Sequence, residues 1–223
     1  MNNINLVKQF TDKFFVKNQD SAHDFDHVLR VYNIAIKLAK NQKVDLEVIK
    51  IAVLLHDIGM GKEIKNSSCD HAIQSAKLAK PFLIKLGLKT NRIQHILDCI
   101  REHRYRNNEQ PKTLESKIVH DADKLDGIGA VGIARDFIWV GKYNAHIYKK
   151  ANIEKYIKEN MGGKTNGKII DKSKHSPQIE WEIKTKYIID RLYIPQAKLL
   201  ARKRLKYCKE YYLKLEREVK GLE

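Results

Sequence analysis

Apolar residues recur every three or four positions along almost the whole chain, which is the spacing of helices that bury one face. Only 11 Gly and 4 Pro interrupt the 223 residues, and Lys, Leu, Ile, Ala and Glu, which favour helices, fill the intervals. No segment alternates apolar and polar residues between turns, as a half-buried strand would. The sequence therefore predicts an all-α fold.

Capping and turn residues divide this pattern into separate helices. Asp45 is suited to the N-cap of a helix that runs to Asp57, because Gly59 follows as a stop signal. Pro81 is expected to divide or kink a later helix that ends at Gly87. The predicted helices cover residues 4–17, 26–41, 45–57, 70–87, 90–103, 113–126, 133–140 and about 179–219. The helix at 70–87 begins at Asp70 or His71, and the helix at 90–103 begins at Thr90. The helix at 179–219 is expected to be interrupted near Pro195.

The length fits one domain spanning residues 1–223. We expect its core at about 20–140, with C-terminal helices at about 179–219 packing on it. Residues 141–177 carry closely spaced Gly, Ser and Pro in their second half and are predicted to be an irregular loop or lid.

Several features argue for a soluble, cytoplasmic protein without a membrane partner. The longest apolar run, Ile51 to Leu55, is far too short to cross a bilayer. The N-terminus has no charged start followed by an apolar stretch, so no secretory signal is expected. The three cysteines lie far apart and form no C-x-x-C pair, which fits reduced thiols and disfavours a thiolate metal site.

The formal net charge of +16 leaves three interpretations open. A basic protein can bind nucleic acid through its phosphates, or attract small polyanions such as nucleotides into a cleft. Alternatively, the scattered lysines simply occupy solvated helix faces. A denser group of basic residues lies near the C-terminus, at Lys198, Arg202, Lys203, Arg204 and Lys206.

Polar side chains of the metal-ligand type lie where the helical pattern predicts burial. His27 shares a face with Val31, and His56 continues an apolar stripe that Asp57 follows. His103 similarly extends a stripe, and residues 120–126 place three carboxylates, at Asp121, Asp123 and Asp126, beside apolar residues.

Buried carboxylates need a positive partner or full hydrogen bonding, because burying an isolated charge is very costly. Several carboxylates that converge with histidines make a divalent cation the economical solution. Such a mixed nitrogen and oxygen set suits Mn²⁺, Fe²⁺, Co²⁺, Ni²⁺ or Zn²⁺ and tolerates Mg²⁺. The sequence therefore predicts a divalent metal site.

The ordered motifs resemble those of the HD-domain superfamily of metal-dependent phosphohydrolases. The resemblance covers most of the chain, weakens over residues 141–177, and is greatest to the small, stand-alone YedJ-like branch. It lies in His23-Asp24-Phe25-Asp26-His27, Leu54-Leu55-His56-Asp57-Ile58-Gly59, Asp121-Ala122-Asp123-Lys124-Leu125-Asp126, the glycine-spaced segment from Gly129 to Arg135, and Ala201-Arg202-Lys203-Arg204.

This resemblance implies which residues bind the metal. It maps the ligands onto His27 rather than His23, onto the pair His56 and Asp57, and onto Asp123 rather than its acidic neighbours. Helix geometry agrees in part, since Asp123 and Asp126 share a face that Asp121 does not.

The resemblance also implies supporting roles. Asp126 is expected to orient a ligand or a water, and Asp57 or Asp126 to accept a proton. We expect one metal, with a second less expected, because His71 and His103, which complete a second site in two-metal relatives, are not followed here by a Gly-Tyr-Pro motif. His23, His71 and His103 are expected to line the pocket, with His71 and His103 acting as hydrogen-bond donors or acid catalysts. Lys62, Lys124 and Arg135 are the cations expected to bind phosphate.

The function that these features imply is hydrolysis of a phosphoester or phosphoanhydride by a metal-activated water. The expected substrate is a small phosphorylated molecule, specifically a nucleotide. The alternative is a basic nucleic-acid-binding protein with a vestigial HD site, which the intact set of four ligands argues against. The sequence does not predict an oligomeric state.

Overall fold

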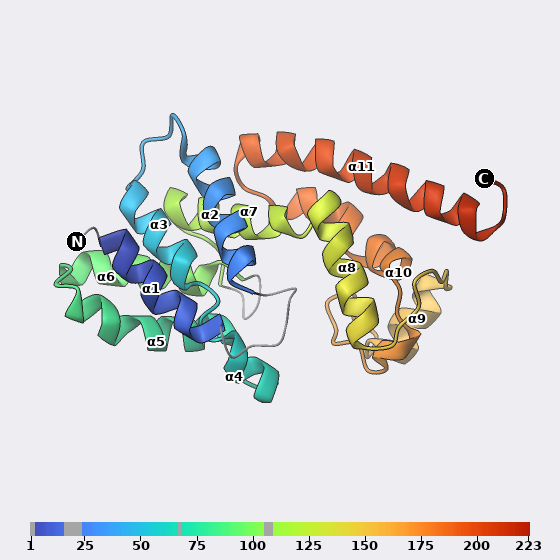
Figure 1. Cartoon of the computed structure of the whole chain (residues 1–223), viewed down its shortest axis with the longest axis horizontal. Coiled ribbons are helices and arrows are strands. Elements are labelled where there is room, and N and C mark those ends of the chain that lie inside the picture. The colour runs from blue at the N-terminus through green and yellow to red at the C-terminus, as the bar shows by residue number, and fades with distance from the viewer. Residues whose placement is uncertain (1–2, 16–23, 67, 105–108) are drawn as a thin grey trace. The chain divides into compact units, whose positions relative to one another are not determined.

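The computed structural model describes residues 3–15, 24–66, 68–104 and 109–223 (Figure 1). All regular structure in these ranges is helical, which confirms the predicted all-α class. The α-helices are α1 (Asn3–Phe15), α2 (Phe25–Ala39), α3 (Leu46–Leu55), α4 (Met60–Lys65), α5 (His71–Lys85), α6 (Thr90–Glu102), α7 (Leu114–Asp126), α8 (Ala130–Lys142), α9 (Ile153–Asn160), α10 (Pro177–Ile183) and α11 (Pro195–Val219), with short 3₁₀ helices η1 (Lys172–Lys174) and η2 (Thr185–Arg191).

The chain forms two compact units, each with its own internal contacts. The first unit comprises Met1–Asp126 and Leu192–Ala197, and the second comprises Gly127–Arg191 and Lys198–Glu223. The expectation of one domain, with the C-terminal helices packed on an earlier core, stays a prediction.

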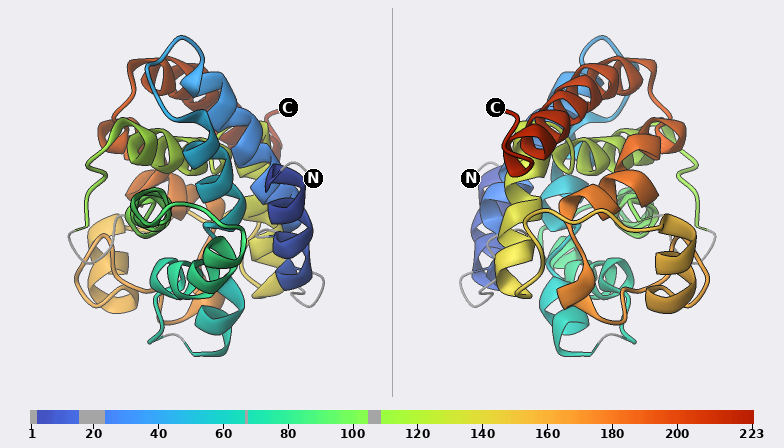
Figure 2. Two further views of the ribbon diagram at one scale, coloured as in Figure 1. Left: turned by 90° about the vertical axis from the view of Figure 1, so that its left-hand side faces the viewer. Right: turned by 90° about the vertical axis from the view of Figure 1, so that its right-hand side faces the viewer.

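Helix α3 is the centre of the first unit. Its residues from Val48 to Leu55 are almost all buried, including Ile51 and Leu54 at 0% exposure. A helix that is apolar on every side must be surrounded, and α1, α2, α6 and α7 all pack on α3 (Figures 1 and 2). The C-terminal end of this buried helix therefore lies inside the unit.

Most of the predicted helix ends are confirmed to within two residues. The Asp45 side chain accepts hydrogen bonds from the backbone N–H groups of Glu47 and Val48, at 3.1 and 3.2 Å, as an N-cap does. Helix α3 ends at Leu55, two residues before its predicted end. Helix α5 runs unbroken through Pro81, so this proline does not divide it, and the alternative that it kinks the helix stays a prediction.

The second unit is built around two apolar clusters. One joins α9 and α10 through Tyr156, Ile179 and Ile183. The other joins α8 and α11 through Ile133 and Cys208.

Gly129, which precedes α8, and the short helix α9 are two features of the second unit. Gly129 precedes α8 with φ +82°, a conformation that favours glycine, and its N–H donates to Cys208 Sγ at 3.1 Å. Residues 141–177 contain α9, so their prediction as an irregular loop is wrong for Ile153–Asn160. The error arose because α9 is only 8 residues long and shows too few turns of apolar periodicity.

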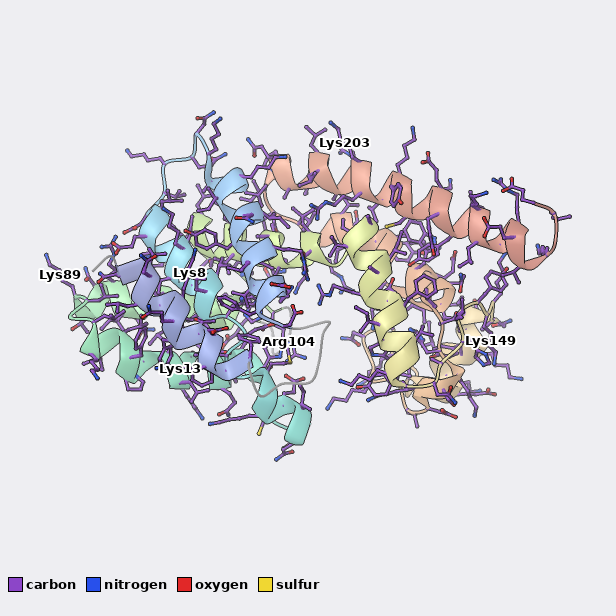
Figure 3. The ribbon with its side chains drawn as sticks, viewed as in Figure 1. Lys8, Lys13, Lys89, Arg104, Lys149 and Lys203 are labelled. Carbon is purple, nitrogen blue, oxygen red and sulfur yellow. The ribbon has the colours of Figure 1, made fainter. Side chains whose placement is uncertain are left out.

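Much of the positive charge lies on solvated surfaces. Lys89 and Lys203 are exposed and project away from the ribbon (Figure 3). Among the helices of the described residues, none combines the length and apolar character needed to cross a membrane.

Candidate metal centre

Helix α2 places His27 in its first turn. The Asp24 side chain caps this helix by accepting a hydrogen bond from the His27 N–H at 2.9 Å. Such a cap contributes about 1 kcal/mol and fixes where the helix starts. The apolar face of α2 then carries His27 into the interior, where it is 1% exposed.

The turn between α3 and α4 holds His56, Asp57 and Gly59. A Cβ atom at Gly59 would lie 2.6 Å from the His71 carbonyl oxygen and 2.6 Å from the Ser75 backbone nitrogen. Only glycine allows α5 to come this close, and the Gly59 N–H donates to Ser75 Oγ at 2.8 Å. The glycine of the His-Asp-Ile-Gly motif thus positions the helix that supplies His71.

His71 and His103 lie at helix ends that face this turn. His71 is the first residue of α5, which Asp70 caps, and His103 is the C-cap of α6. Both are buried, at 7% and 2% exposure.

Helix α7 supplies three carboxylates with three different environments. Asp121 accepts the backbone N–H groups of Tyr193 and Ile194, so it anchors the Leu192–Ala197 segment rather than facing the centre. Asp123 faces His27 and His56, and its side chain is 18% exposed. The expectation that Asp121 points away from the others agrees with this arrangement.

One ligand atom each from His27, His56 and Asp57 lies within 4.8 Å of the others, and Asp123 Oδ1 approaches the two histidines. The His27 Nε2 atom lies 3.6 Å from Asp57 Oδ2 and 3.5 Å from Asp123 Oδ1. The His56 Nε2 atom lies 3.5 Å and 4.0 Å from the same two oxygens. Ligands at about 2.0–2.2 Å from one ion lie within about 4.4 Å of each other, so these separations suit a single shared cation.

The Nδ1 atom of each histidine at the centre is held by an acceptor behind it. His27 Nδ1 bonds Asp126 Oδ2 at 2.8 Å, and His56 Nδ1 bonds the Val53 carbonyl at 2.7 Å. An N–H that donates from Nδ1 leaves the Nε2 lone pair to face the centre, which is the tautomer a metal requires. His103 follows the same rule through the Ile100 carbonyl at 2.6 Å, whereas His71 Nδ1 lies 2.7 Å from the acceptor Glu63 Oε2 and 2.8 Å from the donor Arg104 Nη1.

His56 provides the test of whether a cation fits. Its Nε2 atom is buried and has no hydrogen-bond partner among the described residues. The Oδ1 atom of Asp57 is likewise buried without such a partner. Buried acceptors that face one another are rarely left without a donor. A divalent cation satisfies them together, so the residues fit a metal ion.

A second group shares Asp57 with the first. His71 Nε2 and His103 Nε2 lie 3.2 Å and 3.6 Å from Asp57 Oδ1, and 3.2 Å from each other. Ligand atoms within 4.8 Å of one another occur in two triads that share Asp57, one with His27 and His56 and one with His71 and His103. The expectation of a single ion, with His71 and His103 as pocket residues, stays a prediction.

Burial and neighbouring charges set these groups in their ligand forms. Burial lowers the pKa of His56 and holds that of His103 well below its usual range, so both imidazoles are neutral near pH 7. Burial alone would raise the pKa of Asp57, yet the adjacent His56 and His71 hold it well below the usual range, so this carboxyl is ionised. Neutral imidazole and ionised carboxylate are the species that bind metals.

The predicted substrate contacts are more dispersed. Lys124 Nζ pairs with Asp123 Oδ2 at 2.8 Å and is the predicted cation adjacent to the centre. Lys62 is exposed, and its Nζ atom donates to Gln74 Oε1 at 3.4 Å. Arg135 lies on α8 in the second unit, and His23 lies outside the described residues.

Three charged residues near the ligands were missed by sequence reasoning. Arg30 donates from Nε and Nη2 to the two oxygens of Asp126, at 2.8 and 3.1 Å, and so holds the carboxylate that orients His27. Arg104 pairs with Glu63, which holds His71. Arg30 lies three residues after His27 on the same helix face, a usable signal, whereas no sequence spacing links Glu63 to His71.

An all-helical fold with a buried cluster of histidines and aspartates suited to a metal defines the class of protein. Residues 24–128 match the family model of the HD domain. This part of the chain therefore matches an HD domain, in agreement with the resemblance of its motifs.

Individual relatives agree with this assignment. The Bacillus subtilis protein YpgQ is 31% identical over 135 residues, which is 59% of this chain and 63% of YpgQ. The crystal structure of YpgQ in complex with ADP superposes with a TM-score of 0.72 at 23% identity, covering 99% of this chain and 100% of that one. A predicted HD-superfamily hydrolase from an uncultured Thermotogales bacterium superposes with a TM-score of 0.65 at 25% identity, covering 96% and 91%.

Proposed function

We propose that this protein is a metal-dependent phosphohydrolase that cleaves a phosphoester or phosphoanhydride bond of a nucleotide. The observation that carries the proposal is the convergence of buried acceptor atoms at one point. The buried His56 Nε2 atom has no hydrogen-bond partner among the described residues and faces Asp57 Oδ2 at 3.5 Å and Asp123 Oδ1 at 4.0 Å. An arrangement of this kind is unfavourable unless a cation occupies it.

The proposed ligands are His27, His56, Asp57 and Asp123. When bound there, a divalent ion would supply Lewis acidity toward a phosphoryl oxygen and lower the pKa of water. The supporting residues keep the donor atoms in place. Asp126 and Arg30 fix the ring of His27, because Asp126 accepts from Nδ1 and is itself held by two guanidinium bonds.

The residues around the ligands can handle charge and protons during hydrolysis. Lys124, beside Asp123, is placed to stabilise negative charge that develops on a phosphoryl group. The Nε2 atoms of His71 and His103, at 3.2 Å, can share one proton and return it to a leaving oxygen. We propose that Lys62 and Arg135 contribute less, because Lys62 is solvated and Arg135 belongs to the other unit.

Nucleotides are proposed as the substrate class for two reasons. The net charge of +16 favours the approach of polyanions. YpgQ, a relative of the same fold, has been crystallised with ADP.

The second group of ligands makes the number of ions an experimental question. If His71 and His103 donate from Nδ1, their Nε2 lone pairs and Asp57 Oδ1 are three mutually facing acceptors. One proton shared by the two imidazoles satisfies them in the one-metal form that we propose. A second ion is the alternative, and metal analysis of His103→Ala distinguishes them, since only the two-ion form loses a full equivalent.

The deciding experiment combines metal analysis with a substrate panel. The purified protein is assayed against nucleoside tri-, di- and monophosphates and cyclic nucleotides, each with Mn²⁺, Mg²⁺, Co²⁺ or Ni²⁺. We expect phosphate or pyrophosphate release that Asp57→Ala abolishes and that Asp26→Ala, an exposed carboxylate on α2, leaves intact. Absence of release from every substrate, or full activity in Asp57→Ala, would overturn the proposal.

The alternative of a nucleic-acid-binding protein with a vestigial site makes the opposite prediction. Tight binding of duplex or single strands that weakens steeply with salt, together with no hydrolysis, would support it. The retention of all four ligands, and of the residues that orient them, favours the enzyme.

A further inference from the structure

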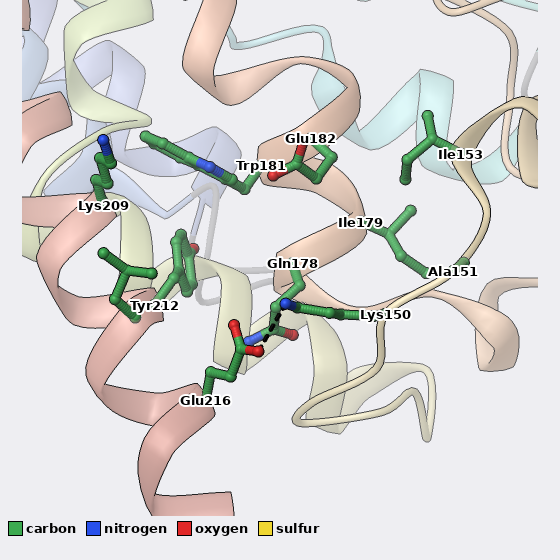
Figure 4. Close-up of a pocket in the computed structure, with 11 residues that line it drawn as sticks. Lys150, Ala151, Ile153, Gln178, Ile179, Trp181, Glu182, Lys209, Tyr212 and Glu216 are labelled. Atoms are coloured by element: carbon green, nitrogen blue, oxygen red, sulfur yellow. Dashed lines mark hydrogen bonds and ion pairs between the residues drawn. The ribbon is translucent and has the colours of Figure 1, made fainter. Parts of the chain in front are cut away.

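A cavity of about 410 Å³ lies within the second unit, between α10, α11 and the segment that precedes α9 (Figure 4). Its volume falls in the range of small-molecule sites, about 300–1,000 Å³. Its walls are largely apolar and include Ile153, Ile179 and Leu213. None of its lining residues belongs to the unit that holds the metal centre.

Two aromatic rings form adjoining walls of this cavity. The rings of Trp181 and Tyr212 lie 5.7 Å apart at an angle of 55°, so they do not stack on each other. The Tyr212 hydroxyl donates to Asp136 Oδ2 at 2.8 Å, which leaves the ring as the part offered to a ligand. A planar aromatic ligand can stack on one of these rings and meet the other edge-on.

Gln178 supplies a directional polar group. Its side chain is buried, at 6% exposure, and its Oε1 atom accepts the Lys149 N–H at 3.4 Å. This bond fixes the amide orientation, since an amide nitrogen cannot accept. The Nε2 atom has no hydrogen-bond partner among the described residues and belongs to a lining residue of the cavity. The cavity therefore offers a buried donor to an acceptor on a ligand.

Some of the charged side chains that line the cavity form ion pairs with other residues. Lys150 pairs with Glu216 at 2.7 Å, and Glu182 pairs with Lys186 at 2.6 Å (Figure 4 draws the first pair). Lys209 is exposed, lines the cavity, and has no ion pair in the part of the chain that the structure describes. One uncommitted cation at the rim favours a ligand that carries a negative group.

We propose that this cavity is a second ligand site that binds a nucleoside monophosphate, a planar nitrogen heterocycle joined to a phosphate. The base stacks on Trp181 or Tyr212 and places a ring nitrogen or carbonyl oxygen against Gln178 Nε2. The phosphate reaches Lys209 at the rim. The site is separate from the metal centre and does not depend on the hydrolase proposal.

Calorimetry on the full chain tests the site, with AMP and GMP as probes and adenosine as the uncharged reference. Trp139→Phe leaves Trp181 as the sole tryptophan, because the chain has two, so its fluorescence reports the ligand directly. We expect saturable binding with a change in Trp181 emission. Binding must persist in Asp57→Ala, which disables the metal centre and prevents turnover of the probe.

Two variants examine the recognition chemistry. Gln178→Glu keeps the acceptor for Lys149 but removes the donor, and should weaken adenosine by about tenfold or more and AMP by at least as much, because the added charge also repels the phosphate. Lys209→Gln should weaken AMP several-fold and leave adenosine unchanged. Lys206→Gln, one turn away on the exposed face of α11, is the matched control.

Specific results would overturn the site. These are no saturable heat with millimolar AMP or GMP, loss of binding in Asp57→Ala, or unchanged affinity in both Gln178→Glu and Lys209→Gln. Thermal melting of each variant shows that it is folded. Hydrolysis without this binding would refute only the second site, and binding without hydrolysis would refute only the proposed function.

Discussion

Both units bury histidines, and His56 in the first unit and His175 in the second have opposite surroundings. His175 in the second unit is 4% exposed, and both of its ring nitrogens are matched, Nδ1 by the Tyr156 hydroxyl at 2.8 Å and Nε2 by Glu180 at 3.2 Å. His56 in the first unit is 0% exposed, and only its Nδ1 atom has a hydrogen-bond partner among the described residues. Burial alone therefore does not distinguish a ligand from a structural histidine.

What separates the two is the chemistry of the groups that face each ring. The neighbours of His175 include a hydroxyl, which can both donate and accept, so the cluster satisfies itself. The neighbours of the His56 Nε2 atom are the carboxylates of Asp57 and Asp123, which only accept when ionised. The cluster around His175 therefore stabilises the fold, and the cluster around His56 is suited to a cation.

Replacing His56 should give the largest effect. We expect His56→Ala to lose bound metal and to reduce hydrolysis by roughly a hundredfold or more, since even residues that only orient a ligand contribute about 10–100-fold. Metal analysis and initial rates measure this. His95→Ala, whose histidine is 30% exposed and away from the centre, is the control. Unchanged metal content in His56→Ala would contradict the assignment of His56 as a metal ligand.

Asp126→Asn examines the support behind a ligand. Its carboxylate accepts from His27 Nδ1 and from Arg30, and an amide cannot hold both equally. We expect metal affinity to fall about 10–100-fold while the ion still binds at saturation. Titration with Mn²⁺ measures the affinity, and Asp26→Asn serves as the exposed control. An unaltered affinity would show that the ring of His27 needs no such support.

The sequence indicated candidate ligands more readily than their surroundings. Helical periodicity predicted that His27 and His56 lie on buried faces, and the resemblance to HD motifs implied the full set with Asp57 and Asp123, which stays a prediction. The bonds from Asp126 to His27 and from Glu63 to His71 join residues 99 and 8 positions apart. Such pairings arise only when helices pack, so no local pattern encodes them.

The same physical limit applies to the fold. Strong periodicity predicted α2, α3 and α6, and a capping aspartate located the start of α3. The helix α9 was missed because 8 residues give little more than two turns of pattern. The unbroken helix at Pro81 reflects tertiary packing, which can outweigh the cost of a proline within a helix.

His175→Ala should reverse the outcome of His56→Ala. Its removal leaves Tyr156 and Glu180 without their shared partner, so we expect the free energy of unfolding to fall by about 2–4 kcal/mol. Bound metal per folded molecule should not change. Thermal and denaturant unfolding measure the stability, with His146→Ala as an exposed control. A loss of metal with unchanged stability would contradict the structural role of His175.

A purely pH-dependent effect is expected at Asp136, whose carboxyl accepts from Tyr212 in the second unit. Burial, aided by the charge of Glu180, raises the pKa of Asp136 to about 7. An unfolded Asp titrates near pH 4, so between about pH 4 and 7 the folded chain retains a proton that the unfolded chain has lost. This group therefore makes the free energy of unfolding decrease as pH rises through that window, and the decrease ends above the folded pKa.

Asp136→Asn removes this contribution because an amide does not titrate. The stability of the variant relative to the unmodified chain should therefore improve between pH 4 and pH 8, by up to about 4 kcal/mol for a pKa raised from about 4 to about 7. Parallel denaturant titrations at several pH values measure the difference, and Asp190→Asn, which alters an exposed carboxylate, should show no such trend. A difference that is flat with pH would mean that Asp136 is ionised in the folded chain throughout. The polar pairs of the second unit would then be as fully matched at pH 8 as at pH 4, which would sharpen their contrast with the metal centre.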